Sequence, residues 1–214
     1  SSTSRGLGDV YKRQEILLTH LDVSRETLEL FVSYGELLLK WQSKINLVSD
    51  KTLDDMWRRH FLDSAQLFEL LPGNNTSILD VGSGAGFPGL VLVLMGARNV
   101  TLIESDTKKC MFLREVLRQT GKSANIVNCR IEEYGSREFD IVTARALAPM
   151  DRLLSYVEPY FGAHTKGLFL KGKQVDEELT KAMKKWKLEV SRVPSITSNA
   201  GVIVVVEKIL SEPE

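Results

Sequence analysis

One segment, Ile78 to Gly89, constrains the fold of this chain more than any other. It opens with the apolar run Ile-Leu-Asp-Val and continues with three glycines, Gly82, Gly84 and Gly86, each separated by one residue. Glycine accepts positive φ angles, and its missing Cβ lets a ligand approach the backbone closely. A proline and a second apolar run follow, which is typical of a helix start. The segment therefore predicts a strand, a tight turn and a helix whose N-terminus faces a ligand.

The spacing of the glycines separates two kinds of ligand. A dinucleotide-binding loop reads Gly-x-Gly-x-x-Gly, but Phe87 stands where its third glycine belongs. The pattern Asp-x-Gly-x-Gly-x-Gly, led by Asp80, instead resembles motif I of class I S-adenosylmethionine-dependent methyltransferases. That cofactor carries a sulfonium and an ammonium, so an acid beside the loop is electrostatically favourable. A second acid, Glu104, ends the next apolar run; it either holds ribose hydroxyls or is a solvated strand end.

Composition limits the remaining classes of protein. The chain has 214 residues, of which 43% are hydrophobic and 26% charged, enough for one domain with an extension or two small domains. The net charge is +0, so nucleic acid could bind only at a local basic patch. Two cysteines and three scattered histidines predict neither a disulfide framework nor a metal site. With no signal peptide and no membrane-spanning run, a cytoplasmic α/β protein is expected.

The first residues read as foreign to the fold. The segment Ser1 to Gly8 is rich in serine and glycine and shows no periodicity. Asp9 to Gln14 resembles the translation of a transposon adaptor used in sequencing libraries. We therefore expect residues 1–14 to be a non-native leader and exclude them from the fold prediction.

Two regions follow the leader. Residues 15–71 predict a helical extension, with one helix from Ser24 to Trp41 and a second from Thr52 through Leu70. Residues 72–214 predict a Rossmann-like domain, because strands and helices alternate as they do in a doubly wound parallel sheet. The expected strands are Ser77–Val81, Asn99–Glu104, Asn125–Asn128, Phe139–Ala144, Gly167–Lys171, Leu188–Val193 and Val202–Lys208. The expected helices are Gly89–Met95, Thr107–Thr120, Pro149–Phe161 and Gln174–Lys185, and the last two strands form a hairpin-like end.

Several short motifs occur together and in one order along the chain. They are Lys40-Trp41, Asn46-Leu47, Arg59-His60, Asp63-Ser64, the glycine loop with its Phe-Pro-Gly ending, Arg145-Ala146 and Leu170-Lys171-Gly172. Together they resemble the RsmG (GidB) family of bacterial methyltransferases, which modify guanine N7 in 16S ribosomal RNA of the small subunit. The resemblance implies an α/β class I methyltransferase fold, with a seven-stranded, mostly parallel sheet, a late antiparallel strand and an N-terminal helical extension. It also implies S-adenosyl-L-methionine as cofactor and ribosomal RNA or a ribosomal subunit as partner.

The same resemblance implies a set of cofactor-binding residues. They are Asp80, Gly82, Gly84, Gly86, Phe87, Glu104, Ile131, Glu132 and Arg145. Three of these have a second interpretation from the residues alone. Glu132 could be an ordinary acid in the first turn of a helix, and Phe87 could wedge the loop against the core. Arg145 could hold the cofactor carboxylate or an RNA phosphate, or it could be a surface arginine.

Candidate RNA contacts are Arg58, Arg59 and His60 on the second helix of the extension, together with Lys171. These charges could equally be a solvated helix face. Asp63 and Ser64 lie one turn further on and are expected as buried partners of His60 or Arg59.

The sequence predicts no catalytic base and no metal ligand. Both cysteines read as small buried residues, and the Asn/Asp-Pro-Pro-Tyr/Phe motif of amino-group methyltransferases is absent after the fourth strand, where Ala-Arg-Ala-Leu stands. This favours a target atom that already offers a free lone pair. Two alternatives stay open: a class I methyltransferase acting on a small molecule or protein, and a non-catalytic RNA-binding protein. A monomer is expected.

Overall fold

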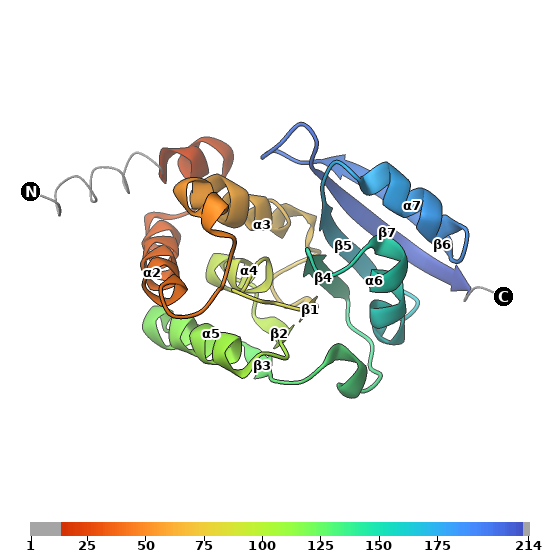
Figure 1. Cartoon of the computed structure of the whole chain (residues 1–214), viewed down its shortest axis with the longest axis horizontal. Helices are drawn as coiled ribbons and strands as arrows, with labels where there is room; N and C mark the ends of the chain where they lie inside the picture. Colours follow the sequence, from red (N-terminus) through yellow and green to blue (C-terminus); the bar gives the residue numbers. More distant parts are fainter. Residues whose placement is uncertain (1–13, 212–214) are drawn as a thin grey trace, which may run out of the picture.

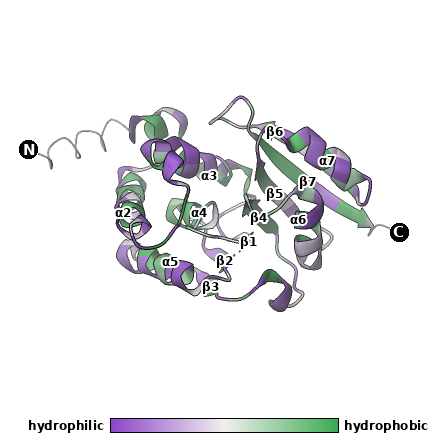
Figure 2. Cartoon of the chain, viewed as in Figure 1, coloured by the Kyte–Doolittle hydropathy of each residue, from purple (hydrophilic) through white to green (hydrophobic). Residues whose placement is uncertain are grey.

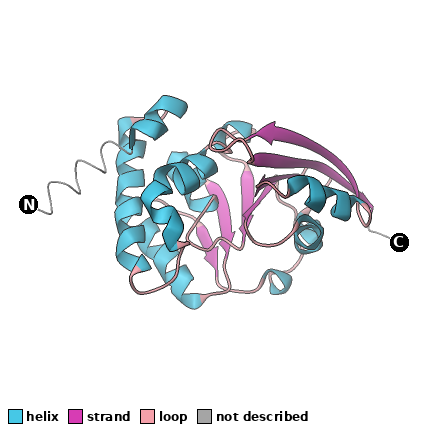
Figure 3. Cartoon of the chain, turned by 45° about the horizontal axis from the view of Figure 1, so that its top comes forward, coloured by secondary structure: helices cyan, strands magenta, loops and turns pink. Residues whose placement is uncertain are grey.

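The computed structural model describes residues 14–211. The expected leader lies outside this range except for Gln14, which is buried and belongs to a helical segment at 14–20. Helices cover both faces of one central sheet, and the described chain runs from the helices on the left of Figure 1 to the hairpin of β6 and β7 on the right. Figure 3 shows the same layers with helices flanking the strands.

The sheet has seven strands in the order β3-β2-β1-β4-β5-β7-β6. Their bounds are β1 Ser77–Val81, β2 Asn99–Ile103, β3 Asn125–Val127, β4 Ile141–Arg145, β5 Lys166–Lys171, β6 Lys187–Pro194 and β7 Val202–Ser211. The pairs among β1 to β5 are parallel, whereas β7 runs antiparallel to both β5 and β6. The predicted doubly wound sheet with a late antiparallel strand is confirmed, and the order reverses between β1 and β4.

Alternate residues of each strand face opposite layers. In β1, Ile78 belongs to the hydrophobic cluster beneath α2, α4 and α5, while Leu79 and Val81 belong to the cluster beneath α6 and α7. Figure 2 shows α4 as largely hydrophobic and the outer turns of α5 and α7 as hydrophilic. Both faces of the sheet are therefore buried, as a parallel sheet requires.

The helices are α2 Arg25–Gln42, α3 Asp63–Ala65, α4 Gly89–Met95, α5 Thr107–Thr120, α6 Met150–Val157 and α7 Val175–Met183. The predicted cap of α2 is confirmed, since the Ser24 hydroxyl accepts a hydrogen bond from the Thr27 amide. One prediction was too long: the helix expected to reach Phe161 ends as α6 at Val157 and continues only as a 3-10 turn, Glu158–Tyr160. Pro159 explains this, because proline removes a helical N–H and clashes with the preceding turn.

The segment predicted as one helix from Thr52 through Leu70 is mostly helical, but it is not a single regular α-helix. This segment is a series of short pieces: a 3-10 helix at Asp50–Asp55, a π-helix at Trp57–Leu62, α3, and a 3-10 helix at Phe68–Leu70. Thr52 does not cap a helix, because its hydroxyl donates to the Ser49 carbonyl and contacts the His60 ring. Tertiary contacts of this kind override the helical periodicity that the sequence shows, and π-helical turns often occur at functional sites.

The extension and the Rossmann-like part share one core. The Tyr34 ring of α2 stacks on Phe87 of the glycine loop, with ring centroids 5.2 Å apart, and its hydroxyl donates to the Ala85 carbonyl. Phe61 packs edge-on against both rings. The domain boundary near residue 72 stays a prediction, while the contacts show that α2 holds the loop in place.

Candidate functional site

A cleft of about 1440 Å³ opens at the carboxyl ends of the strands. Residues after β1, β2, β3, β4 and β5 line it, together with the segment 47–63 and the loop between β6 and β7. Ligands of open α/β sheets bind where the strand order reverses, which here is the gap between β1 and β4. The cleft is therefore the candidate functional site.

The three glycines of the loop have different surroundings, although all have positive φ angles of +65° at Gly82, +56° at Gly84 and +99° at Gly86. A Cβ on Gly84 would meet nothing closer than 3.9 Å, so this glycine faces open space in the cleft. A Cβ on Gly82 would lie 2.6 Å from Leu147, and one on Gly86 would collide with Tyr34 and Leu90. Gly84 thus leaves room for a ligand beside the backbone, whereas Gly86 permits packing behind the loop.

Asp80 lies beneath the loop and not in the cleft. Its side chain is fully buried and accepts hydrogen bonds from the Thr143 hydroxyl at 2.7 Å and the Gly89 amide at 3.3 Å. Burial raises the pKa of Asp80 to about 6, while the hydrogen bond from Thr143 opposes the shift. The Asp80 side chain therefore joins β1 to β4 and to the start of α4, and these hydrogen bonds hold the loop in its conformation.

Glu104 follows β2 and lines the cleft with its carboxylate. One oxygen accepts a hydrogen bond of 2.7 Å from the Gly84 amide, and the other accepts one of 3.0 Å from the Asp106 amide. Beyond β3, Ile131 and Glu132 line the same side of the cleft from a short 3-10 helix, Ile131–Glu133. These residues fit S-adenosylmethionine. The Glu104 carboxylate follows β2 beside the open Gly84, and Ile131 and Glu132 add an apolar side chain and an acid beyond β3.

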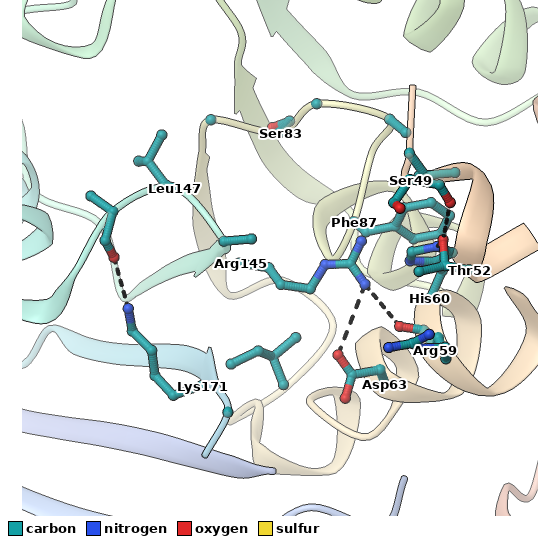
Figure 4. Close-up of a pocket in the computed structure, with 18 of the residues that line it drawn as sticks. Ser49, Thr52, Arg59, His60, Asp63, Ser83, Phe87, Arg145, Leu147 and Lys171 are labelled. Atoms are coloured by element: carbon teal, nitrogen blue, oxygen red, sulfur yellow. Dashed lines mark hydrogen bonds and ion pairs between the residues drawn. The ribbon is translucent and has the colours of Figure 1, made fainter. Parts of the chain in front are cut away.

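Arg145 ends β4 at the centre of the cleft (Figure 4). Its guanidinium carbon lies 5.0 Å from the centroid of the Phe87 ring, one Nη1 proton is donated to the Arg59 carbonyl at 3.0 Å, and Asp63 lies 3.9 Å away. Burial lowers the pKa of Arg145 from its usual value, and Asp63 opposes this shift. The structure therefore excludes the surface interpretation of Arg145, whose side chain is 19% exposed.

His60 stacks on the same Phe87 ring, with centroids 5.1 Å apart. Its Nε2 atom lies 2.7 Å from the Thr52 hydroxyl, and Nδ1 has no partner among the described residues. Burial, together with the positive charges of Arg145 and Arg59, lowers the pKa of His60 to about 3, so the ring is neutral near pH 7. Thr52 thus takes the place of the expected partners of His60.

Asp63 and Ser64 were predicted as partners of His60 or Arg59, and the structure contradicts this. Asp63 instead faces Arg145 and accepts hydrogen bonds from Gln66 and the Thr197 hydroxyl, the latter at 2.9 Å. The Ser64 hydroxyl is buried without a partner among residues 14–211. Asp63 therefore joins the end of β4 to the loop between β6 and β7.

Two of the candidate RNA contacts are already occupied within the protein. Arg58 binds the Asp55 carboxylate and donates to the Thr197 carbonyl at 2.6 Å. Lys171 donates to the Ala148 carbonyl at 2.8 Å and to Glu178 at 3.0 Å. Arg59, by contrast, is exposed on the cleft and forms no ion pair with any described residue.

The cleft is much more basic than the chain as a whole. Eight lysine and arginine side chains line it against four aspartates and glutamates, although the net charge of the chain is +0. Within the described range, five of the eight cations form no ion pair: Arg59, Lys109, Arg130, Arg152 and Lys173. A concentration of positive charge in one cleft attracts a polyanion.

Sequence reasoning missed the loop after β4. Ala146 has a φ of +52°, Leu147 is 37% exposed, and both line the cleft. The run Arg-Ala-Leu-Ala-Pro directly after a buried strand was the available signal, because strand ends on this edge carry function. Among the described residues no group of three His, Cys, Asp or Glu could hold a metal ion, and no helix there is long and apolar enough to span a membrane.

The strand order, the glycine loop after β1 and the acid that follows β2 together define a class I S-adenosylmethionine-dependent methyltransferase. Two solved structures share the fold at low identity. The ribosomal protein L11 methylase of Lactobacillus delbrueckii subsp. bulgaricus is 14% identical, with a TM-score of 0.55 over 71% of this chain and 77% of that one. A TehB-like methyltransferase from Corynebacterium glutamicum is 16% identical, with a TM-score of 0.55 over 83% of this chain and 98% of that one.

Within this class the chain belongs to the GidB family, ribosomal RNA small subunit methyltransferase G, whose model matches residues 27–204. The relative from Paramagnetospirillum magneticum is 51% identical over 190 residues, covering 89% of this chain and 93% of its own length. The relative from Parvibaculum lavamentivorans is 48% identical, and the match covers 86% of this chain and 84% of the relative. Both are named ribosomal RNA small subunit methyltransferase G. The match includes the cleft and the extension from residue 27 onward.

Proposed function

We propose that this protein transfers a methyl group from S-adenosylmethionine to N7 of a guanine in 16S ribosomal RNA. The observation that carries the proposal is the cleft itself, where the Glu104 carboxylate and the open Gly84 lie beside five cations that form no ion pair with any described residue. Membership of the family supports the same substrate. An activity on ribosomal RNA also agrees with the cytoplasmic location expected from the sequence.

Glu104, Gly84, Ile131 and Glu132 are the proposed cofactor contacts. Glu104 already accepts two backbone hydrogen bonds, one at each oxygen, and each oxygen keeps a lone pair for a ribose hydroxyl. Ile131 and Glu132 lie past β3, two strands from the glycine loop, where they could border the adenine. Asp80 and Gly86 are buried outside the lining of the cleft and support the loop from behind, whereas the buried Phe87 ring lines the cleft under Arg145.

The chemistry needs no proton acceptor from the protein. S-adenosylmethionine supplies a methyl group on a sulfonium, and guanine N7 offers a lone pair that carries no proton. His60 is neutral and has its Nε2 engaged with Thr52, which agrees with the absence of a general base. The work of the side chains is then to align the base with the methyl group and to exclude water.

The substrate side of the cleft must admit a base that is not paired in a helix. N7 lies in the deep, narrow major groove of an RNA duplex, so the guanine has to come from a loop or leave its stack. Arg59, Arg130, Arg152 and Lys173 are the proposed contacts to the RNA backbone. A monomer is the proposed working form.

Labelled S-adenosylmethionine tests the proposal. The protein is incubated with small-subunit ribosomal RNA, and separately with small subunits, from a strain that lacks the modification, and the methylated base is mapped. Label at N7 of one guanine is the expected result. Label in protein or in a small molecule would favour a different methyltransferase, and RNA binding without label would favour a non-catalytic protein.

A further inference from the structure

The turn after β4 holds the one described non-glycine residue with a positive φ, Ala146 at +52°. An L-residue adopts this conformation at a cost in free energy, and such outliers gather at active sites. The strained residue directs the chain so that Leu147 stands 37% exposed in a cleft whose walls carry eight cations. Among the described residues, Leu147 is the exposed large apolar side chain that lines the cleft.

A partly buried ion pair fixes the turn. The Lys171 side chain, which is 8% exposed, donates through its ammonium to the Ala148 carbonyl at 2.8 Å and to the Glu178 carboxylate at 3.0 Å (Figure 4 shows the first contact). The same Glu178 oxygen accepts the amide of Met150 at 3.0 Å, on the other side of Pro149. The turn is therefore tied to β5 and α7, so that the strained conformation persists.

Leu147 stands at the point where the strand order reverses. Its Cδ1 atom occupies the place beside Gly82 that a Cβ would need, at 2.6 Å, so Gly82 makes room for this leucine. The proposed cofactor contacts Glu104 and Glu132 lie over β2 and β3, on the other side of β1. Leu147 consequently borders the half of the cleft left for the substrate, next to the end of the glycine loop.

We propose that Leu147 is the platform against which the target guanine is held, and that this platform is aliphatic because the product is a cation. The inference rests on the proposed function. When N7 forms its bond to the methyl carbon, the carbon–sulfur bond breaks with both electrons on sulfur, and the purine keeps the positive charge. An aromatic ring at this position would attract the cationic product, whereas leucine offers the charged base no such attraction.

Truncation tests the first half of the proposal. Leu147→Ala should lower the single-turnover methylation rate at saturating substrates by at least about tenfold, because the base is no longer held in line with the methyl group. Its calorimetric affinity for S-adenosylmethionine should stay within about twofold of wild type. Leu147→Met should retain activity, since it restores apolar volume. Leu39→Ala, which truncates an exposed leucine on α2, is the matched control.

Leu147→Phe tests the second half. The single-turnover rate of this variant should stay close to that of the wild type. The ratio of its affinity for methylated RNA to its affinity for unmethylated RNA should rise by about threefold or more, and steady-state turnover should be slower because the product is retained. An unchanged affinity ratio would overturn the aliphatic argument. An unaffected Leu147→Ala, or one impaired only in cofactor affinity, would overturn the platform. If wild-type protein methylates no guanine in the same preparation, the proposed function fails and this inference fails with it.

Discussion

The carboxylate of Glu104, at the end of β2, accepts a hydrogen bond of 2.7 Å from the backbone amide of Gly84 in the loop after β1. The two residues are 20 positions apart in the chain and on neighbouring strands of the sheet. The acid that is proposed to bind the ribose therefore also fixes the turn over which the cofactor lies. Stability and cofactor affinity should respond together when this side chain is changed.

Glu104→Ala should lower both quantities. The amides of Gly84 and Asp106 lose their acceptor, and each lost hydrogen bond at this partly exposed place costs about 0.5–1.5 kcal/mol. Affinity for S-adenosylmethionine should fall by about tenfold or more, which is about 1.4 kcal/mol. Calorimetry and urea unfolding measure the two effects. A variant that keeps wild-type affinity would remove Glu104 from the cofactor site.

Gly84→Ala separates backbone strain from ligand contact. The φ of +56° costs an alanine about 1–2 kcal/mol, and its Cβ points into open cleft space. Gly121→Ala is the matched control, because Gly121 has a φ of +67°, open space around its Cβ and a place at the end of α5. Both variants should lose similar stability, but only Gly84→Ala should lose cofactor binding. Equal cofactor affinity in the two variants would contradict the role of Gly84.

Much of the sheet could be predicted because its signals are local. The run from Ile78 to Val81, the glycines and the apolar stretch after Pro88 each follow from a residue's own conformational preference. The same holds for α5, where Asp106 caps the first turn. Glu104, a proposed cofactor contact, could be predicted for the same reason, since it directly follows the end of β2.

The substrate side could not be predicted, because its contacts join distant parts of the chain. No local pattern tells that Thr52 binds the His60 ring, that Asp63 faces Arg145, or that Lys171 is held by Glu178. Arg58 read as a free cation, yet it pairs with Asp55 three residues away and donates to the Thr197 carbonyl, 139 residues away. Sequence alone identifies which residues carry charge, and only the fold shows which charges are neutralised.

The pH dependence of stability should reveal Asp80. Its pKa of about 6 in the folded protein lies above the ordinary value near 3.8, so folding retains a proton that the unfolded chain releases. The stability that this group contributes is present below about pH 4 and is lost as the pH rises to about 6. Asp80→Asn should remove this loss, so its free energy of unfolding, from urea titrations, should rise more steeply between pH 4 and 6 than that of wild type. If the free energies of unfolding of Asp80→Asn and wild type change in parallel between pH 4 and 6, the raised pKa of Asp80 is contradicted.

The methylation rate should be nearly flat between about pH 6 and 8.5. With a pKa of about 3, His60 stays neutral throughout this range, and guanine N7 has no proton to lose. Single-turnover rates with both substrates saturating are the measurement. A tenfold rise centred near pH 6.5 that disappears in His60→Asn would show that His60 acts as a base, and would put N7 in doubt as the target.

Salt dependence should distinguish free from paired cations. Each single-strand phosphate contact adds roughly 0.7 log units to the salt slope of RNA affinity. Arg59→Ala should reduce the slope by about one contact, because Arg59 is exposed and forms no ion pair in the described range. Arg58→Ala should leave the slope unchanged, since Asp55 already neutralises that charge. Equal reductions in both variants would contradict this assignment.

The contact between Arg58 and the Thr197 carbonyl also concerns the order in which the parts of the cleft form during translation. Arg58 leaves the ribosome long before Thr197, and β7, the last strand in the described residues, pairs with β5 inside the sheet. A nascent chain can form the glycine loop and its support from α2 while the wall near Thr197 is still missing. The substrate side of the cleft is therefore the last part to take shape, and a chain that is still being translated cannot yet present it to the ribosomal RNA around it.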